Sequence, residues 1–489
     1  MEHAVILTLI LLPVVVGVAL AAMRLTCRRL KLALIFAVLV LELLGTIWLS
    51  LQDVTPIALL HITDTLSIGF YADNLSELFS VVTAAGWLLT GLYAFSYMRH
   101  YENEDRFFCF FLIVEGMLLG MDYAFDLVTM YLFYEMLTLM SIPLVLHTQT
   151  QEANSAAMKF FMYSMAGALL ALFGIVTLSN VTPGFNFVSG GTLDSGLMAG
   201  HEGLVLAAVF VAVLGCGAKA GLFPMHSWLP TAHPVAPAPA SAVLSALIAK
   251  AGIFAILRIV FYVVGTEFLT GTWVQMALLT VALLTVVMGS TMAYLEDNFK
   301  KRLAYSTVGQ ISYILCGIFL LTPAGLVGGL LHFSFHACIK ALLFLVAGSV
   351  IFYTGKTQVQ GLRGIGRRMP ITMGCFAMGA LALIGIPPFS GFVSKWYLAT
   401  AALDSGLRVF SWLVPLVLLL SSLLTAGYLL TIVINAFFPG HEYIEEVPVR
   451  ERDALMLSPI VLFAAMALML GVCSGDLVAW VTGVARTLG

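Results

Sequence analysis

Residues 219–252 read KAGLFPMHSWLPTAHPVAPAPASAVLSALIAKAG. The segment begins at Lys219 and ends just after Lys250, and long apolar runs continue on both sides of it. Pro224 follows Lys219 closely, and a proline inside a helix removes a backbone donor and interrupts the helix. The surrounding sequence is apolar enough for lipid, so this segment predicts membrane helices. Basic side chains beside a proline break in such helices indicate a functional role for the charges.

The rest of the chain has the same apolar character. Of 489 residues, 61% are hydrophobic and 10% are charged, and the mean hydropathy is +1.02. A membrane span needs about 20 mostly apolar residues, and the sequence holds about 14 such runs. We therefore predict an all-α, polytopic membrane protein. The runs are 4–23, 32–51, 75–97, 107–122, 126–146, 159–180, 203–225, 240–264, 272–294, 303–321, 326–353, 371–398, 409–437 and 456–482.

Five charged residues lie in the middle of these apolar runs: Glu135, Lys219, Lys250, Lys340 and Lys395. A charge at bilayer depth costs about 2.5–3.5 kcal/mol on insertion scales. A chain that repeats this cost several times is expected to use the charges to move ions or protons. The alternative is structural, with Lys219 and Glu135 as a fixed ion pair and Lys395 extending to the lipid headgroups.

A second interrupted run resembles the first in composition. Residues 383–398 read LIGIPPFSGFVSKWYL, where Pro387 and Pro388 precede Lys395. Interrupted spans at matching places in two halves indicate inverted repeats with an ion path between them. We expect N-terminal helices over 1–100, repeats over 101–265 and 266–440, and a C-terminal helix over 441–489. Ordinary proline kinks are the alternative.

The run 326–353 carries His332, His336 and Lys340 on one face. At 1.5 Å per residue this stripe is about 12 Å long. Histidine titrates near physiological pH, which suits a water-linked proton relay. The two histidines could also hold a metal, but no third ligand is apparent, so we expect no metal site. The remaining alternative is that these three side chains only pack in the core, with their hydrogen bonds satisfied.

Further polar residues are weaker candidates. Glu115 is either an additional relay group or a neutral acid in the core. His226 and His233 either link Lys219 to water or cap helices. Arg258 is either part of the path or extends to the interface.

Other functional classes lack support. The seven cysteines are scattered without a C-x-x-C pair, which argues against disulfides, zinc and iron–sulfur clusters. No phosphate loop or G-x-G-x-x-G is present, and nothing indicates nucleic-acid binding. The chain itself is therefore expected to hold no redox or catalytic site, and no cofactor beyond ordered water.

The basic residues predict the orientation. Alternate loops place most of them on one side, which the positive-inside rule makes cytoplasmic, with both termini outside. Only Arg408 and Arg486 fall on the other side. The cytoplasmic group is Arg24, Arg28, Arg29, Lys31, Arg99, Arg106, Lys159, Lys300, Lys301, Arg302, Lys356, Arg363, Arg367, Arg368, Arg450 and Arg452.

Residues 219–252 also resemble a signature of antiporter-like membrane subunits. These occur in respiratory complex I, in Mrp-type cation/proton antiporters and in energy-converting membrane-bound hydrogenases. Three further blocks match that family: DNFKKRLAYSTVGQISYI at 297–314, HACIKALLFLVAGSV at 336–350 and GIPPFSGFVSKWYL at 385–398. The resemblance covers nearly the whole chain and implies fourteen helices with two inverted five-helix repeats.

The resemblance also implies roles for individual residues. Glu135 would pair with Lys219, and Lys250 would connect to the stripe of His332, His336 and Lys340. Lys395 would be the terminal group, whereas Glu115 lies outside the family pattern. The chain's length favours an inner complex I, Mrp or hydrogenase subunit over the distal complex I subunit, and its FVSKW sequence favours the Mrp and hydrogenase groups.

The function expected from this resemblance is proton translocation by a subunit of a hetero-oligomeric complex in a prokaryotic cytoplasmic membrane. Its partners would be other membrane subunits, the lipid bilayer, H⁺ and, in some members, Na⁺. One alternative is a subunit of an Mrp-type Na⁺(K⁺)/H⁺ antiporter without redox coupling. A structural membrane scaffold is the alternative from another class.

Overall fold

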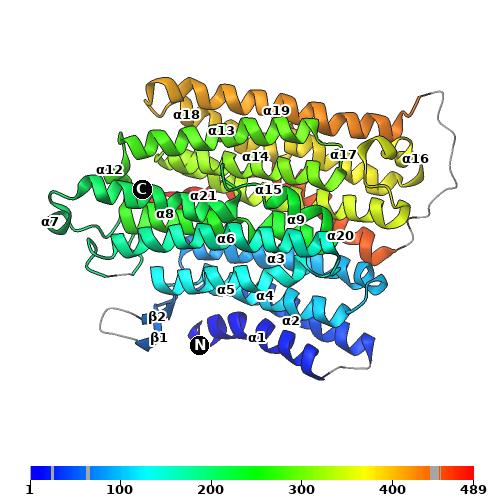
Figure 1. Ribbon diagram of the computed structural model, residues 1–489, viewed down its shortest axis with the longest axis horizontal. Helices are drawn as coiled ribbons and strands as arrows, with labels where there is room; N and C mark the ends of the chain where they lie inside the picture. The colour runs from blue at the N-terminus through cyan, green and yellow to red at the C-terminus, as the bar shows by residue number, and fades with distance from the viewer. Residues whose placement is uncertain are drawn as a thin grey trace.

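The computed structural model describes residues 2–23, 27–61, 67–184, 186–440, 451 and 453–488. These residues form long helices that run side by side, with a small β-hairpin at one end of the array (Figure 1). Within them, 11 helices are long and apolar enough to cross a membrane. The predicted all-α, multi-pass membrane architecture is therefore confirmed.

The first half of the chain supplies one edge of the array. The hairpin pairs its two strands antiparallel, with Ile57 opposite Phe70 and His61 opposite Ser67. The elements are α1 (Glu2–Met23), α2 (Arg28–Leu49), β1 (Ile57–His61), β2 (Ser67–Phe70), α3 (Asn74–Tyr97), η1 (Met98–His100), α4 (Glu104–Asp122), α5 (Leu127–Val145), α6 (Gln151–Leu178), α7 (Ser195–Met198), α8 (Glu202–Ala220), α9 (Leu229–Val235), α10 (Ala238–Val243), η2 (Leu244–Ile248), α11 (Lys250–Leu257), η3 (Arg258–Val264) and α12 (Thr266–Leu269).

The second half supplies the centre and the opposite edge, where α13, α18 and α19 lie (Figure 1). The elements are α13 (Trp273–Leu295), α14 (Phe299–Phe319), α15 (Pro323–Thr354), η4 (Val359–Leu362), α16 (Ile365–Arg368), α17 (Pro370–Ile384), α18 (Ser390–Leu403), α19 (Arg408–Phe437), α20 (Ala454–Val472) and α21 (Gly475–Leu488).

The predicted count of fourteen spans is not confirmed. The helices at runs 107–122 and 303–321, α4 and α14, are not among the 11 candidates, and both carry charged first turns. Run 371–398 is divided between α17 and α18. All four helices nevertheless run alongside their neighbours in the array (Figure 1).

The C-terminal run 456–482 also differs from the single helix expected there. Helix α20 ends at Val472, and the amphipathic helix α21 begins at Gly475. Helix α21 packs on α15 and α3. It buries Val481, Val484 and Leu488.

Helix α15 is the centre of the fold. It spans 32 residues, and every residue from Gly325 to Val350 is buried. It packs against helices from both halves of the chain, including α3, α10, α14, α17, α18, α20 and α21. A helix covered by protein on all sides can carry polar groups that lipid would reject, and α15 holds the histidine stripe.

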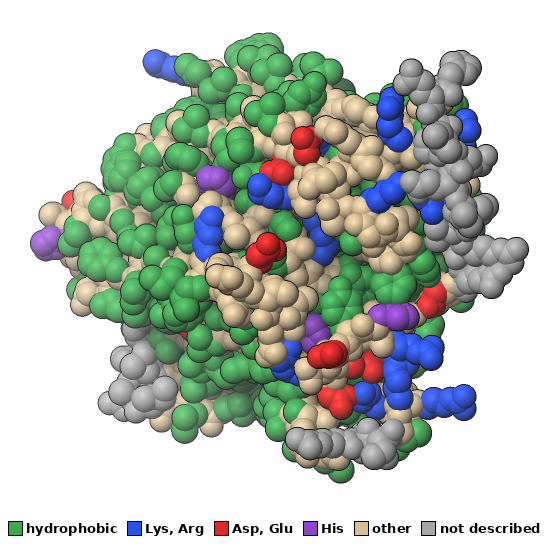
Figure 2. All heavy atoms as spheres, turned by 45° about the vertical axis from the view of Figure 1, so that its right-hand side comes forward, with side chains coloured by type: hydrophobic (Ala, Val, Ile, Leu, Met, Phe, Trp, Pro, Cys, Tyr) green, Lys and Arg blue, Asp and Glu red, His purple; other side chains and the backbone are tan. Residues whose placement is uncertain are grey.

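Most Lys and Arg side chains visible in Figure 2 lie toward the end of the array that is at the right of Figure 1. Helix α1 begins, and α21 ends, toward the opposite end (Figure 1). Three basic residues used for the orientation, Arg24, Arg450 and Arg452, lie outside the described residues.

Candidate functional site

Glu135 and Lys219 form the first polar group, on α5 and α8. Lys219 is fully buried, and its Nζ donates to the Tyr134 carbonyl at 2.5 Å and lies 3.5 Å from the centroid of the Tyr134 ring. Glu135 is half-buried and interacts electrostatically with Lys219, but its Oε1 has no hydrogen-bond partner among the described residues. The ammonium is therefore held by Tyr134, within electrostatic range of the carboxylate.

Lys219 lies in the last turn of α8, just before the chain leaves the helix. The helix ends at Ala220, Gly221 takes the left-handed conformation with φ of 78°, and α9 begins only at Leu229. Pro224 lies in this interruption, as does the half-buried His226. Carbonyls near the end of α8 lie at the negative pole of its dipole, which favours a cation there.

Lys250 lies on a helix that contacts α8 closely. A side chain at Gly252 would collide with the Cys216 carbonyl and the Ala220 backbone, so α11 and the last turn of α8 meet directly. Lys250 itself follows the π-helical turn η2, and its Nζ donates to the Ser245 carbonyl at 2.5 Å. Such turns often occur at functional positions, because they leave carbonyls free to accept other donors.

Helix α14 links Lys250 to the stripe on α15. The Ser245 and Thr307 hydroxyls are 2.7 Å apart. On the same helix as Thr307, the Leu303 carbonyl accepts from Lys340 Nζ at 3.1 Å, and the Ser306 hydroxyl accepts from it as well. The Lys340 ammonium is thus tied to α14 by neutral oxygens.

The two histidines of the stripe differ in their surroundings. His332 Nδ1 is 2.9 Å from the Ser394 hydroxyl, and its Nε2 is 3.1 Å from Gln310 Oε1. The ring of His336 stacks on it, with the centroids 5.8 Å apart. His336 is fully buried, and neither of its ring nitrogens has a partner among the described residues.

Lys395 belongs to the second interrupted run. Helix α17 ends at Ile384, Pro387 and Pro388 lie in the turn that follows, and Lys395 lies on α18. Its Nζ donates back to the Leu383 and Ile384 carbonyls, both at 2.9 Å. The ammonium therefore binds the negative end of the α17 dipole instead of extending toward lipid headgroups.

His336 joins these residues into one central cluster. It lies within electrostatic range of Lys250, Lys340, His332 and Lys395. The electrostatic neighbours of Lys219, in contrast, are Glu135 and Cys216. The predicted residues thus fall into a Glu135–Lys219 pair on α5 and α8 and a Lys250–Lys395 cluster on α11, α15 and α18. The two groups come nearest where α8 contacts α11.

Sequence reasoning missed a lysine near this cluster. The charge pattern predicts a cytoplasmic loop position for Lys300, but this residue is buried, and its Nζ donates to the Ala236 carbonyl at 2.6 Å. It interacts electrostatically with His233, which is also fully buried. The signal was available: Lys300 lies in the block 297–314, yet its position among consecutive basic residues suggested solvent.

Glu115 lies apart from both groups. It is fully buried on α4, and its electrostatic neighbour is Glu42 of α2. Glu42 is fully buried too, and the sequence analysis did not single it out. Glu115 therefore lies beside a second glutamate and outside the groups that contain the buried lysines.

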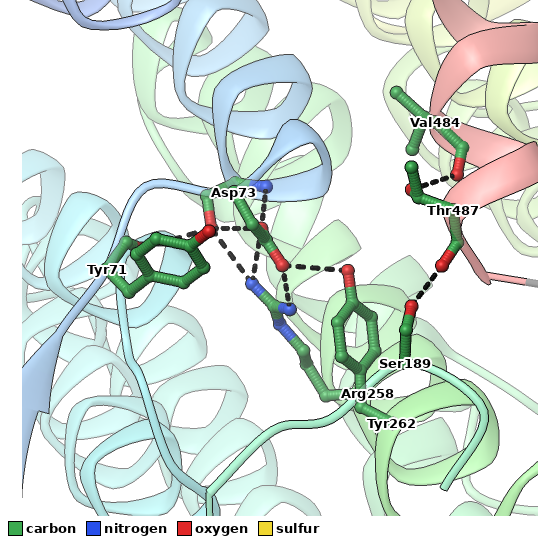
Figure 3. Close-up of polar contacts among 8 residues, drawn as sticks. Tyr71, Asp73, Ser189, Arg258, Tyr262, Val484 and Thr487 are labelled. Carbon is green, nitrogen blue, oxygen red and sulfur yellow. Dashed lines mark hydrogen bonds and ion pairs between the residues drawn. The ribbon is translucent and has the colours of Figure 1, made fainter. Parts of the chain in front are cut away.

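Arg258 neither joins the central cluster nor extends to the interface. It is 1% exposed, and its Nη1 and Nη2 donate to the two oxygens of Asp73 at 2.6 and 2.9 Å. Figure 3 shows this pair with Tyr262, whose hydroxyl also donates to Asp73. The ion pair lines a cavity of about 440 Å³, together with Glu77 of α3 and Thr487 of α21.

Replacing Asp73 with asparagine should destabilise the protein by about 3–5 kcal/mol, because Arg258 would remain buried without its carboxylate. Burial raises the pKa of Asp73, but the charge and hydrogen bonds of Arg258 lower it by more. The resulting pKa is about 2, below the ordinary value of 3.8. The stabilisation is therefore complete above pH 3.8 and lost as the pH falls toward 2. Melting curves of the purified complex would measure it.

Asp53→Asn is the matched control, because Asp53 lines the same cavity but is exposed. It should leave the melting temperature nearly unchanged. Equal melting temperatures for Asp73→Asn and the unmodified protein between pH 5 and pH 8 would contradict the assignment.

Comparisons with known proteins agree with this architecture. Residues 124–432 match the family model "NADH:quinone oxidoreductase/Mrp antiporter, TM". The chain is 34% identical to NADH-quinone oxidoreductase subunit N of Desulforudis audaxviator, over 81% of this chain and 80% of that protein. It is 33% identical to hydrogenase-4 component B of Escherichia coli, over 66% of this chain and 49% of that protein.

A solved structure is similar over nearly its whole length. A chain of the Mrp complex from Dietzia sp. DQ12-45-1b superposes with a TM-score of 0.87 and 25% identity, covering 100% of this chain and 97% of that chain.

Proposed function

The chain belongs to the family of antiporter-like transmembrane subunits of NADH:quinone oxidoreductases and Mrp antiporters, and we propose that it translocates protons through its buried Lys, His and Glu side chains. It is a multi-pass subunit of a multi-subunit membrane complex. The observation that carries the proposal is the cluster around the fully buried His336, whose electrostatic neighbours include the buried Lys250 and the half-buried Lys395.

The Glu135–Lys219 pair is the proposed input. A carboxylate in electrostatic range stabilises the ammonium form of Lys219, so a movement that separates the two favours release of its proton. The next acceptor is Lys250, on the helix in direct contact with α8. Neither transfer needs a direct ion pair between Glu135 and Lys219. This agrees with the structure, in which the Lys219 ammonium donates to the Tyr134 carbonyl.

From Lys250 the proposed route follows α15. Ordered water is expected beside His336, whose two ring nitrogens have no protein partner, and would connect it to His332 and Lys340. Lys395 is the proposed last station. His226 and His233 lie at and after the interruption of α8, where they suit proton entry from water.

The orientation follows from the basic side chains. We propose that the end of the array rich in Lys and Arg is cytoplasmic, which leaves both termini outside. We also propose that residues 101–265 and 266–440 are two inverted repeats, because the interruptions after Lys219 and before Lys395 hold similar positions in each. Fourteen spans are consistent with this arrangement.

The energy must come from outside this chain. Moving one charge against 100 mV costs about 2.3 kcal/mol. Either a redox partner supplies it, as in an oxidoreductase or hydrogenase complex, or an opposing Na⁺ or K⁺ gradient does. The similarity to a chain of an Mrp complex keeps the second arrangement open.

Purification of the complex from its native membrane tests the function. We expect other membrane subunits to copurify, and the reconstituted complex to move protons. If redox subunits copurify, transport should start on adding an electron donor; if only small membrane subunits do, a Na⁺ or K⁺ gradient should start it. A purified complex that moves no protons under either condition would favour the scaffold alternative.

A further inference from the structure

Two carboxylates in the N-terminal helices have no place in the route above. Glu42 of α2 and Glu115 of α4 are both fully buried. All four of their carboxylate oxygens lack a hydrogen-bond partner among the described residues. They also lie close enough to interact electrostatically. Two ionised carboxylates so placed would repel each other in a dry interior, so the pair needs a positive charge between them.

Among the described residues, no cation interacts electrostatically with Glu42 or Glu115. Helix α11, which also contacts α4, carries Lys250, but the electrostatic neighbour of that lysine is Lys340. Helix α1 packs on both α2 and α4, but it has no ionisable side chain after His3. The charged residue of α3 is Glu77, and that of α5 is Glu135. Beside Glu42 lies an apolar groove of about 620 Å³ between α1 and α2. A bound proton, which needs no cage of ligands, satisfies the pair in such a setting.

A string of polar groups leads from the pair toward the Arg258 cavity. Glu77, in the first turn of α3, lines that cavity although it is only 7% exposed. One turn further, the Ser80 hydroxyl accepts from the Tyr123 hydroxyl at 2.9 Å. Tyr123 lies within electrostatic range of both Glu77 and Glu42. It therefore connects the cavity end of the string with the carboxylate pair.

Asp122 adds a second link beside Tyr123. It is almost fully buried, one of its oxygens accepts from Thr83 at 3.4 Å, and the other has no partner among the described residues. Glu115 precedes it on α4 by two turns, or about 10 Å along the axis. Hydroxyl and carboxyl groups thus lie between the cavity and the pair, and the longest step is the one from Asp122 to Glu115 along α4.

We propose that Glu42 and Glu115 form a proton-binding carboxylate pair, loaded from the Arg258 cavity through Glu77, Ser80, Tyr123 and Asp122. The site lies in α2, α3 and α4, away from the central cluster around α15. It goes beyond the proposed function, because it would bind protons whether or not Lys219 and Lys250 conduct them.

Carbodiimide labelling of the intact, reconstituted complex tests the pair. Dicyclohexylcarbodiimide is apolar, reacts with protonated carboxyls and can reach Glu42 through the lipid-side groove. Peptide mass spectrometry should find adducts on Glu42 or Glu115, and none on the exposed control Glu152 of α6. Labelling should persist in Lys219→Ala. Absence of adducts on both glutamates would overturn the proposal.

Two further outcomes would also count against it. Protection from labelling by Na⁺, but not by choline at equal pH and ionic strength, would identify a sodium site and overturn the proton assignment. Loss of labelling in Lys219→Ala with the complex intact would show that the pair receives its protons through the lysine route. That result would overturn the proposal that the pair binds protons independently of Lys219.

Infrared spectroscopy tests the access route. The carbonyl band of the protonated pair, identified by its loss in the Glu42→Gln and Glu115→Gln variants, should shift in D₂O. Tyr123→Phe removes one hydroxyl at nearly constant volume and should slow that shift about tenfold. The same slowing is expected when Asn74→Cys, at the cavity, is modified by a membrane-impermeant thiol reagent. An unchanged rate in both cases would overturn the route.

Discussion

Proton translocation by the assembled complex should fall at least about tenfold when Lys219 is replaced by alanine, since an ionisable relay group contributes at least that much to proton transfer. Its ammonium is fully buried, at the end of an interrupted helix and over the ring of Tyr134. No other lysine appears among its electrostatic neighbours, which are Glu135 and Cys216. No lysine among these neighbours can therefore take its place.

The measurement is the initial rate of pH change in proteoliposomes, with subunit content checked by gel. Glu135→Gln should lower the rate less, because it removes the modulating charge and leaves the carrier. Lys301→Ala is the matched control, since that lysine is 39% exposed and paired with Glu296 at the interface. Full transport by an intact Lys219→Ala complex would show that this lysine only fixes helices.

The charged members of the site were predictable from sequence because each one stands out in an apolar run. Lys250, Lys340 and His336 could be identified without a structure for that reason. Their neutral partners could not. Ser245, Ser306 and similar hydroxyls are common in membrane helices. Only the hydrogen bond between η2 and α14 and the packing of α14 on α15 show which of them lie near a lysine.

Contacts between residues far apart in the sequence could not be predicted either, because they also depend on packing. Arg258 and Asp73 are separated by 185 positions, and nothing near either residue indicates the other. The division of the C-terminal run into α20 and α21 was also missed, since both helices are apolar enough to continue one span. Hydropathy gives the number of runs approximately, but interruptions depend on what packs against them.

The second large effect is expected at His336. Replacing it with phenylalanine keeps a ring that can stack on His332 and removes two nitrogens that have no protein partner. Transport should fall at least about tenfold, since the ring joins Lys250 to Lys395. The melting temperature of the complex should be little changed, because no protein hydrogen bond is lost.

His332→Phe is the matched comparison, on the same helix and with the same change of ring. It removes the contacts of the ring with the Ser394 hydroxyl, which still donates to the Gly391 carbonyl, and with Gln310 Oε1, which should cost about 1–3 kcal/mol of stability. A relay role for His336 thus predicts lost transport at unchanged stability, whereas a packing role predicts that both variants lose stability. Full transport by His336→Phe would remove the link from Lys250 to Lys395 and with it the proposed route along α15.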